Sequence, residues 1–243
     1  MRKEFAMLHI STIFLLFMVY SILGWLFETI YCSLTHLSWD NRGMLNGPYC
    51  PIYGVGAILA AILCQNITSP WLIFLTCAVG ASILEYFTSF VTEKLFHAVW
   101  WDYSYLPFNL NGRICLSVAL GFGFTGIVVV RFLHPVVFRF VNSLPFSVHE
   151  FLALFLMCIF SADIALTLDA LISLNEKLAA LEDSINESIS ERYDAVVSRA
   201  KETLSTSQKH ILKSFHSFRE VRYSELGYKL KAAIQKKKNP EDE

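Results

Sequence analysis

Long apolar runs separated by short polar segments occupy the first two thirds of the chain. A helix that crosses a bilayer needs about 20 predominantly apolar residues. Four runs reach that length, and a fifth, shorter run reaches it only with the residues on either side. Runs of this kind indicate helices, because a helix satisfies its own backbone hydrogen bonds in lipid. The predicted spans are residues 7–32, 51–64 (extended to 49–67), 71–91, 114–133 and 151–172.

The pattern predicts an all-α protein. We expect a polytopic membrane bundle of about five transmembrane helices, with a long C-terminal helical tail outside the membrane. Residues 1–172 form the predicted transmembrane domain and residues 173–243 the charged tail. The first segment holds 7 Lys and Arg and 9 Asp and Glu, whereas the shorter second segment holds 13 and 12. The hydrophobic fraction of 54% and the mean hydropathy of +0.46 are both high for a soluble protein.

A single apolar stripe runs along the tail. Apolar side chains recur at steps of three and four from Leu171 to Leu204, which is typical of a helix with one apolar face. No Pro or Gly interrupts the pattern before Gly227. The stripe suits a coiled coil or a partner-binding arm. It suits equally a helix that folds back as a hairpin or lies on the membrane surface.

Membrane lipids are the first expected partner, for a multi-pass protein of the cell membrane. The N-terminal run has no small-residue cleavage site after it, which favours an uncleaved anchor. Four Lys or Arg residues flank the spans on each side, so the positive-inside rule gives no orientation. The length and charge of the tail, with its run Lys236-Lys237-Lys238, favour the cytoplasmic side. No nucleic acid is expected as a partner.

Two glutamates interrupt the apolar runs. Glu28 lies late in the first run and Glu85 about two thirds of the way through the third. An ionisable group is costly in hydrocarbon, so such residues usually face the bundle interior or a water-filled cavity. The directions of the helices place both glutamates in the same half of the membrane. That half meets the polar loops 33–50 and 92–113.

The two loops on that side are rich in Gly, Pro, Tyr and Trp. Gly and Pro shape tight turns, and Tyr and Trp suit the membrane interface. An arginine there can pair with a carboxylate or bind an anionic ligand. The predicted ligand or polar site consists of Glu28, Asn41, Arg42, Tyr53, Glu85, Trp101, Asp102, Tyr103, Asn109, Asn111 and Arg113.

Familiar catalytic motifs are missing from the sequence. It has no Gly-x-Ser-x-Gly, no His-Glu-x-x-His and no P-loop, so catalytic residues stay unassigned and an enzyme is the less favoured interpretation. Its six cysteines show no C-x-x-C spacing, so neither a metal ion nor a cofactor is expected. Asp163 is expected to face the core and lies outside the predicted site. A purely structural network of Arg–Glu pairs is the main alternative to a ligand site.

Motifs around both glutamates and in both loops form a longer pattern. Its parts are Gly24-Trp25, Glu28, Asn41-Arg42-Gly43, Gly47-Pro48, Pro51-Ile52-Tyr53-Gly54, Glu85-Tyr86, Trp101-Asp102-Tyr103-Ser104 and Asn109-Leu110-Asn111-Gly112-Arg113. Over roughly residues 10–170, the chain resembles the CmpB family, bacterial membrane proteins labelled "putative ABC-transporter (type IV) permeases". The resemblance implies a multi-helix membrane domain, a transport function and a separate ATPase subunit as partner. It implies no substrate and no set of catalytic residues.

Three functions follow from these observations. The first is a permease-like component or small-ligand-binding membrane protein with its polar site on one side of the bilayer. The second is a membrane enzyme acting on a lipid or lipid-linked substrate, with Glu28 or Glu85 as general base. The third is a non-catalytic scaffold whose tail binds a protein partner or a second copy of the chain.

Overall fold

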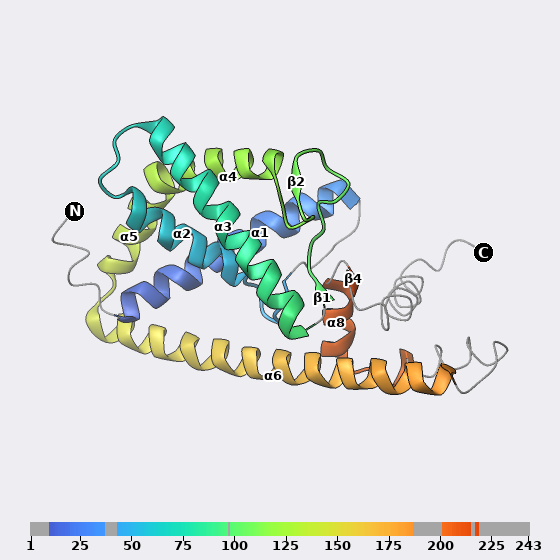
Figure 1. Cartoon of the computed structure of the whole chain (residues 1–243). Coiled ribbons are helices and arrows are strands. Elements are labelled where there is room, and N and C mark those ends of the chain that lie inside the picture. Colours follow the sequence, from blue (N-terminus) through green and yellow to red (C-terminus); the bar gives the residue numbers. More distant parts are fainter. Residues whose placement is uncertain (1–9, 37–42, 97, 187–200, 215–216, 219–243) are drawn as a thin grey trace. The chain divides into compact units, whose positions relative to one another are not determined.

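The structure is a computed structural model that describes residues 10–36, 43–96, 98–186, 201–214 and 217–218. Most of the described residues are helical and the strands have only two residues each, which confirms the predicted all-α class. The elements drawn in Figure 1 are α1 (Ile10–His36), α2 (Pro51–Cys64), α3 (Pro70–Phe96), β1 (Ala98–Val99), β2 (Asn109–Leu110), β3 (Ile114–Cys115), α4 (Leu116–Val128), the π-helical turn η2 (Val129–Leu133), α5 (His134–Ser143), α6 (Phe146–Asn186), α8 (Thr206–Ser214) and β4 (Ser217–Phe218).

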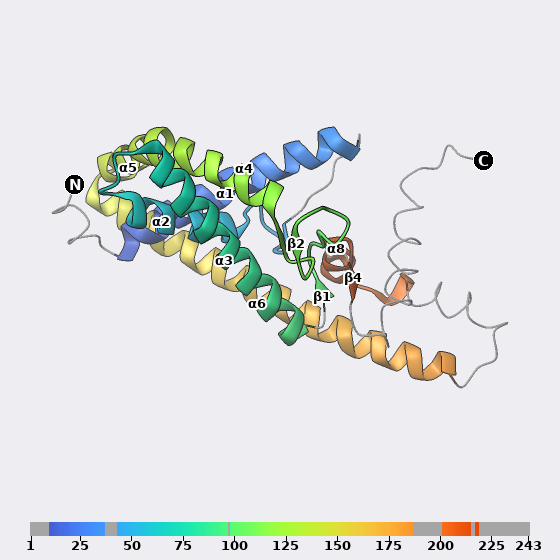
Figure 2. The same cartoon turned by 45° about the horizontal axis from the view of Figure 1, so that its top comes forward.

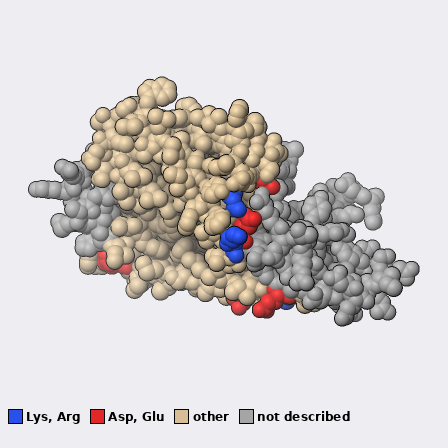
Figure 3. Space-filling view, in the orientation of Figure 1, with Lys and Arg blue, Asp and Glu red and all other residues tan. Residues whose placement is uncertain are grey.

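The chain is a membrane protein by the length and composition of its helices. Helix α2 is apolar but has only 14 residues, which is about 21 Å at 1.5 Å per residue and short of a hydrocarbon core of about 30 Å. The predicted count of five spans is therefore not confirmed. On the face drawn in Figure 3, charged side chains occupy only small areas of the described surface. The described residues hold four candidate spans, Ile10–Tyr31, Pro70–Phe96, Leu116–Ser143 and Phe146–Leu178.

The fourth apolar run continues as a helix well past its predicted end at residue 133. Helix α4 passes through η2 into α5, so residues 116–143 are helical throughout. Pro135 explains the π-helical turn, because its nitrogen has no hydrogen to donate to the carbonyl of Arg131 and its ring crowds that carbonyl. Most of the predicted connection 134–150 is thus helical.

Two compact units divide the chain, and α3 and α6 contribute residues to both. The first unit comprises Met1–Thr88 and Tyr103–Asp163, and the second comprises Ser89–Asp102 and Ile164–Glu243. The predicted domain boundary at residue 172 falls inside α6 and stays a prediction.

In the first unit α1 lies against α2, as Figures 1 and 2 both show. Two glycines permit this close approach. A Cβ atom on Gly24 would lie 2.3 Å from the Cβ of Tyr53, and one on Gly54 would lie 2.2 Å from the Oγ of Ser21. Tyr53 is thereby packed directly on α1. One core cluster joins α1, α5 and α6 through the buried residues Leu15, Leu16, Tyr20, Val137, Val141 and Ala153.

The tail, in the second unit, is not one uninterrupted helix. Ser205 Oγ accepts a hydrogen bond from the backbone N–H of Gln208 over 3.2 Å, and Gln208 Oε1 accepts one from the N–H of Ser205 over 3.0 Å. This reciprocal pair is a capping box, which begins a new helix without help from Gly or Pro. Helix α8 starts there, although neither Gly nor Pro marks the position in the sequence.

The end of α6 and α8 contact each other within the second unit. Lys177 Nζ donates hydrogen bonds to Gln208 Oε1 over 3.0 Å and to the carbonyl of Thr203 over 3.2 Å. The tail thus folds back on itself, which is one of the structures that the stripe allowed. A coiled coil stays a prediction, because residues 187–200 and 219–243 lie outside the described residues. The buried apolar residues of this unit include Leu171, Leu174, Leu178, Leu204, Ile211 and Leu212.

Candidate functional site

Glu85 is a buried carboxylate on α3, with 7% of its surface exposed. Its Oε1 accepts a hydrogen bond from the hydroxyl of Tyr103 over 3.2 Å. Its Oε2 is also buried and has no hydrogen-bond partner among the described residues. Buried polar atoms normally have a partner, because burial without one costs free energy. Glu85 is therefore an incompletely satisfied carboxylate inside an apolar helix.

Glu28, on α1, lies in the same neighbourhood. The thiol of Cys50 donates to its Oε2 over 3.8 Å. Its carboxylate also interacts electrostatically with Glu85, Tyr53 and Tyr103. Burial, followed by the negative charge of Glu28, raises the pKa of the Cys50 thiol. We call Glu28, Cys50, Tyr53, Glu85 and Tyr103 the acid cluster.

A β-hairpin supports Tyr103 beside Glu85. Strands β2 and β3 pair antiparallel and residues 111–113 join them. The φ values of Asn111 and Gly112 are 55° and 68°. Two positive φ values in succession are the mark of a type I′ turn, which the Asn-Gly dipeptide adopts readily. The N–H of Tyr103 donates to the carbonyl of Gly112 over 2.8 Å. Burial, followed by the charge of Glu85, raises the pKa of the Tyr103 hydroxyl.

Other predicted residues of the hairpin contact Tyr86 or the hairpin itself. Asn111 Nδ2 donates to the Tyr86 hydroxyl over 3.1 Å, and the Arg113 guanidinium lies 5.6 Å from the centre of the Tyr86 ring. Asn109 Oδ1 accepts a hydrogen bond from the N–H of Gly112 over 3.1 Å. These three residues therefore shape the hairpin and attach it to α3.

Four predicted site residues lie elsewhere or cannot be placed. Trp101 and Asp102 belong to the second unit, where the ring of Trp101 lies 6.2 Å from that of Trp100. Asn41 and Arg42 lie outside the described residues. That the predicted set binds a ligand stays a prediction. The predicted residues that lie together in the acid cluster are Glu28, Tyr53, Glu85 and Tyr103.

Asp163, on α6, was not among the predicted site residues, yet it binds the segment that precedes Cys50 of the acid cluster. Its carboxylate accepts hydrogen bonds from the backbone N–H and side-chain amide of Asn46 (3.1 and 2.9 Å), the N–H of Gly47 (2.8 Å) and the hydroxyl of Tyr49 (2.5 Å). Burial, followed by the hydrogen bond to Asp163, raises the pKa of the Tyr49 hydroxyl. These contacts fasten the segment that leads into Cys50. No local sequence signal identifies them, because the partners are 114 to 117 residues apart.

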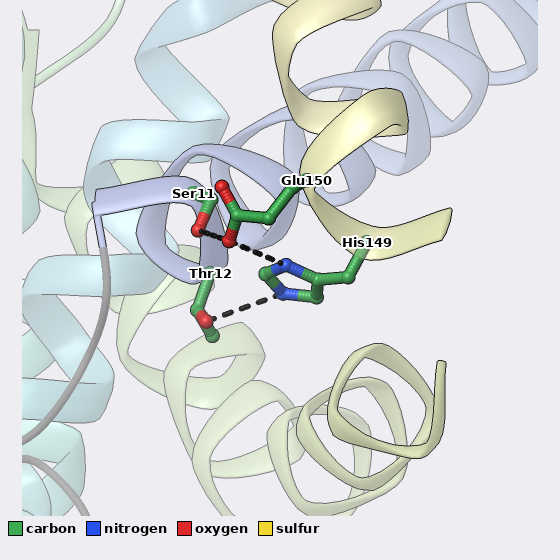
Figure 4. Close-up of polar contacts among 4 residues, drawn as sticks. All are labelled: Ser11, Thr12, His149 and Glu150. Carbon is green, nitrogen blue, oxygen red and sulfur yellow. Dashed lines mark hydrogen bonds and ion pairs between the residues drawn. The ribbon is translucent and has the colours of Figure 1, made fainter. Parts of the chain in front are cut away.

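A second polar group joins the beginnings of α1 and α6, and Figure 4 shows its four side chains turned toward one another. Ser11 Oγ donates to Glu150 Oε1 over 2.6 Å, and Thr12 Oγ1 shares a hydrogen bond with His149 Nε2 over 3.2 Å. His149 Nδ1 lies 3.4 Å from Glu150 Oε1. Both nitrogens of His149 therefore have a partner, so these four side chains link α1 to α6.

Comparison with known proteins places these features in a family. The sequence model of the CmpB family, described as "Putative ABC-transporter type IV", matches residues 15–168, which include the whole acid cluster and more than half of the chain. The resemblance expected from the motifs is thereby confirmed. No curated protein and no solved structure matches the chain.

Proposed function

The chain belongs to the CmpB family, described as "Putative ABC-transporter type IV", and on this premise we propose that it is the membrane-spanning component of an ATP-driven transporter. Its four candidate membrane spans support this role. A separate ATPase subunit would supply the energy. The proposed location is the cell membrane, with the charged tail on the cytoplasmic side, where it would bind that subunit or a second copy of the chain.

One observation carries the proposal for the site. Glu85 is buried in a candidate membrane span, yet one of its oxygens has no partner among the described residues. Burying a carboxylate is costly, and a purely structural carboxylate normally has its hydrogen bonds completed. An incomplete carboxylate beside a second one suits a site that a transported molecule completes on binding. We therefore assign the acid cluster to contact with that molecule.

ATP hydrolysis by the purified complex tests the proposal. The full-length chain is tagged, expressed in cells that carry its partners and purified in mild detergent, as wild type, Glu85→Gln and Asp169→Asn. Asp169 is an exposed carboxylate on α6 and serves as the matched control. We expect ATP hydrolysis to co-purify with all three proteins. We expect the rate to fall about tenfold in Glu85→Gln alone, because a site that lacks its charge no longer couples substrate to the ATPase.

The two readouts separate the two parts of the proposal. Hydrolysis no higher than in a purification from cells without the tagged chain contradicts the transporter role. Hydrolysis that is equal in wild type and Glu85→Gln contradicts the assignment of the acid cluster.

A further inference from the structure

Large apolar side chains lie on the outside of the loop that precedes α4. This segment, residues 103–116, contains the β2–β3 hairpin (Figure 1). Tyr105 and Phe108 are 78% and 82% exposed, and Leu110 is 54% exposed. Arg113 is the only charged residue in the sequence of the segment. Single exposed apolar side chains are ordinary, but several so close together mark an interaction surface.

The surface leads into an exposed apolar stripe on α4. The N–H of Leu116, the first residue of α4, donates to the carbonyl of Phe108 over 3.3 Å. The stripe consists of side chains at steps of four, each 43–62% exposed, namely Leu116, Leu120, Phe124 and Val128. Residues at this spacing share one face of a helix, and α4 is part of a candidate membrane span. An exposed apolar face of a span has lipid as its neighbour, so Phe108 adjoins a lipid-facing surface.

The hairpin is attached to α3 within the apolar part of that helix. Asn111 Nδ2 donates to the hydroxyl of Tyr86 over 3.1 Å, and the Arg113 guanidinium lies 5.6 Å from the centre of the Tyr86 ring. Tyr86 precedes the charged pair Glu93 and Lys94 by seven residues, which is about 10 Å along a helix. Since charged residues near the end of a span mark its exit from the hydrocarbon, the hairpin is held close to the apolar layer.

Internal hydrogen bonds tie the backbone of the hairpin to itself. The N–H of Tyr103 donates to the carbonyl of Gly112 over 2.8 Å, and the N–H of Leu106 donates to the carbonyl of Tyr103 over 2.9 Å. Asn109 adds two bonds, from its Nδ2 to the carbonyl of Leu106 (2.7 Å) and from the N–H of Gly112 to its Oδ1 (3.1 Å). Backbone groups without partners are costly in lipid, so a segment bonded in this way is suited to the edge of a bilayer.

We propose that the tip of the hairpin, residues 105–110, is inserted into the bilayer where the headgroups meet the acyl chains. Phe108 contacts acyl chains beside the α4 stripe. The ring of Tyr105 lies in the same layer with its hydroxyl toward the headgroups, as suits a tyrosine at a membrane interface. Phe108 has a φ of 54°, which a bulky residue rarely adopts and which is found most often at functional positions. The inference requires α3 and α4 to cross the membrane and does not depend on the transporter role.

Protein is a less suitable neighbour for this surface than lipid. A partner protein or a second copy of the chain that covered Phe108 would also displace lipid from the start of the α4 stripe, because Phe108 is hydrogen-bonded to Leu116. Lipid covers both surfaces at once. The hairpin that presents Tyr103 to Glu85 therefore has the bilayer as its outer neighbour.

Photocrosslinking in the membranes of the expressing cells tests this placement. The full-length chain carries p-benzoylphenylalanine in place of Phe108 or Tyr105, and mass spectrometry identifies the adducts after irradiation and purification. The control positions are Phe124 on the α4 stripe and the exposed Glu202 of the charged tail. We expect lipid adducts at positions 105 and 108 with yields within about threefold of position 124 and about tenfold above position 202.

The yields decide the inference. Should the chain labelled at position 108 not fold, position 105 decides alone. In a folded chain, a yield of lipid adducts no higher than at position 202, or crosslinks mainly to protein, overturns the inference at either position. If position 124 gives no lipid adducts, the stripe does not face lipid and the inference fails with it.

Fragmentation of the adducts measures the depth. We expect bonds to the glycerol region or the first part of the acyl chains at positions 105 and 108. At position 124 we expect bonds further along the acyl chains, because Phe124 lies about 12 Å along α4 from Leu116. Adducts at position 108 as far along the chains as those at position 124 overturn the interfacial placement. Co-purifying ATP hydrolysis with no lipid adducts at positions 105 and 108 contradicts this inference alone and leaves the transporter proposal standing.

Discussion

Asp163 and Glu85 are two carboxylates of the same unit that are buried alike, with 8% and 7% of their surface exposed, yet their hydrogen bonding differs. Asp163 accepts four hydrogen bonds from the segment Asn46, Gly47 and Tyr49. Glu85 accepts one from Tyr103, and its second oxygen has no partner among the described residues. A carboxylate offers about four acceptor sites, so the first is complete and the second is not.

The difference teaches that burial alone does not reveal the purpose of an intramembrane carboxylate. At Asp163 the chain supplies four hydrogen-bond donors from one short segment, residues 46–49. A side chain at position 47 would disturb this arrangement of donors, because a Cβ on Gly47 would lie 2.4 Å from the Tyr49 ring. At Glu85 the described residues supply a single hydrogen bond, from the hydroxyl of Tyr103. The donors that a carboxylate lacks, more than its depth, indicate whether it holds the fold or awaits a ligand.

Asp163→Asn is the change expected to have the largest effect. The amide cannot accept all four hydrogen bonds, and its NH₂ group faces groups that are themselves donors. Since hydrogen bonds to a charged group contribute about 1.5–3 kcal/mol each, we expect a loss of about 3 kcal/mol of unfolding free energy. Reversible unfolding of the full-length chain in mixed micelles measures it. A loss no larger than that of the exposed control Asp169→Asn would remove the structural role of Asp163.

The two tyrosines that donate to these carboxylates give the next test. Tyr49→Phe removes one of four hydrogen bonds from a complete, buried carboxylate, and we expect a loss of about 2 kcal/mol. Tyr103→Phe removes the single hydrogen bond to a carboxylate that is already incomplete, and we expect a loss of about 1 kcal/mol or less. The same unfolding measurement compares them. A larger loss from Tyr103→Phe than from Tyr49→Phe would reverse the comparison.

Alkaline pH probes the same two hydroxyl groups. Burial raises the pKa of both Tyr49 and Tyr103 above the usual value, which is about 10. The unfolded chain then loses these protons first, so their contribution is fully present below pH 10 and is lost as the pH rises. Between pH 9 and pH 11 we expect the free energy of unfolding to fall by about 1.4 kcal/mol for each of the two tyrosines.

Unfolding free energies at the two pH values, for wild type and variants, measure this slope. Tyr49→Phe and Tyr103→Phe should each reduce the decrease in unfolding free energy between pH 9 and pH 11. Tyr105→Phe, which changes an exposed tyrosine of the same loop, should leave it as in wild type. An equal effect of Tyr105→Phe would show that the buried pair does not govern the alkaline loss.

Sequence patterns predicted the long helices because crossing a bilayer imposes a length and a composition that each segment carries by itself. That α2 crosses the membrane together with its flanking residues stays a prediction, because the helix itself has only 14 residues. The patterns also placed a loop after residue 133, where the chain instead continues as α5 because the π-helical turn before it accommodates the missing N–H of Pro135. Local signals did exist for two features that went unrecognised, the Asn111-Gly112 turn and the Ser205–Gln208 capping box.

In the candidate site, too, the residues with a local sequence signal could be predicted and those that depend on tertiary packing could not. Glu28 and Glu85 could be predicted because each is a lone charge in an apolar run. The role of Asp163 could not be predicted, because its donors come from a segment more than a hundred residues earlier in the chain. Tertiary packing decides which carboxylate receives donors, and a one-dimensional pattern does not contain that information.

Glu85→Gln is expected to have the smallest effect on stability and is the sharpest test of the comparison. The amide oxygen can still accept from Tyr103, and the cost of burying a charge disappears. We therefore expect the unfolding free energy to stay within about 1 kcal/mol of wild type, or to rise. Unfolding in the same micelles as Asp163→Asn checks this directly. A loss of unfolding free energy as large as that of Asp163→Asn would mean that Glu85 stabilises the fold through contacts of its own. The lack of a partner at its Oε2 among the described residues would then be no evidence for a ligand.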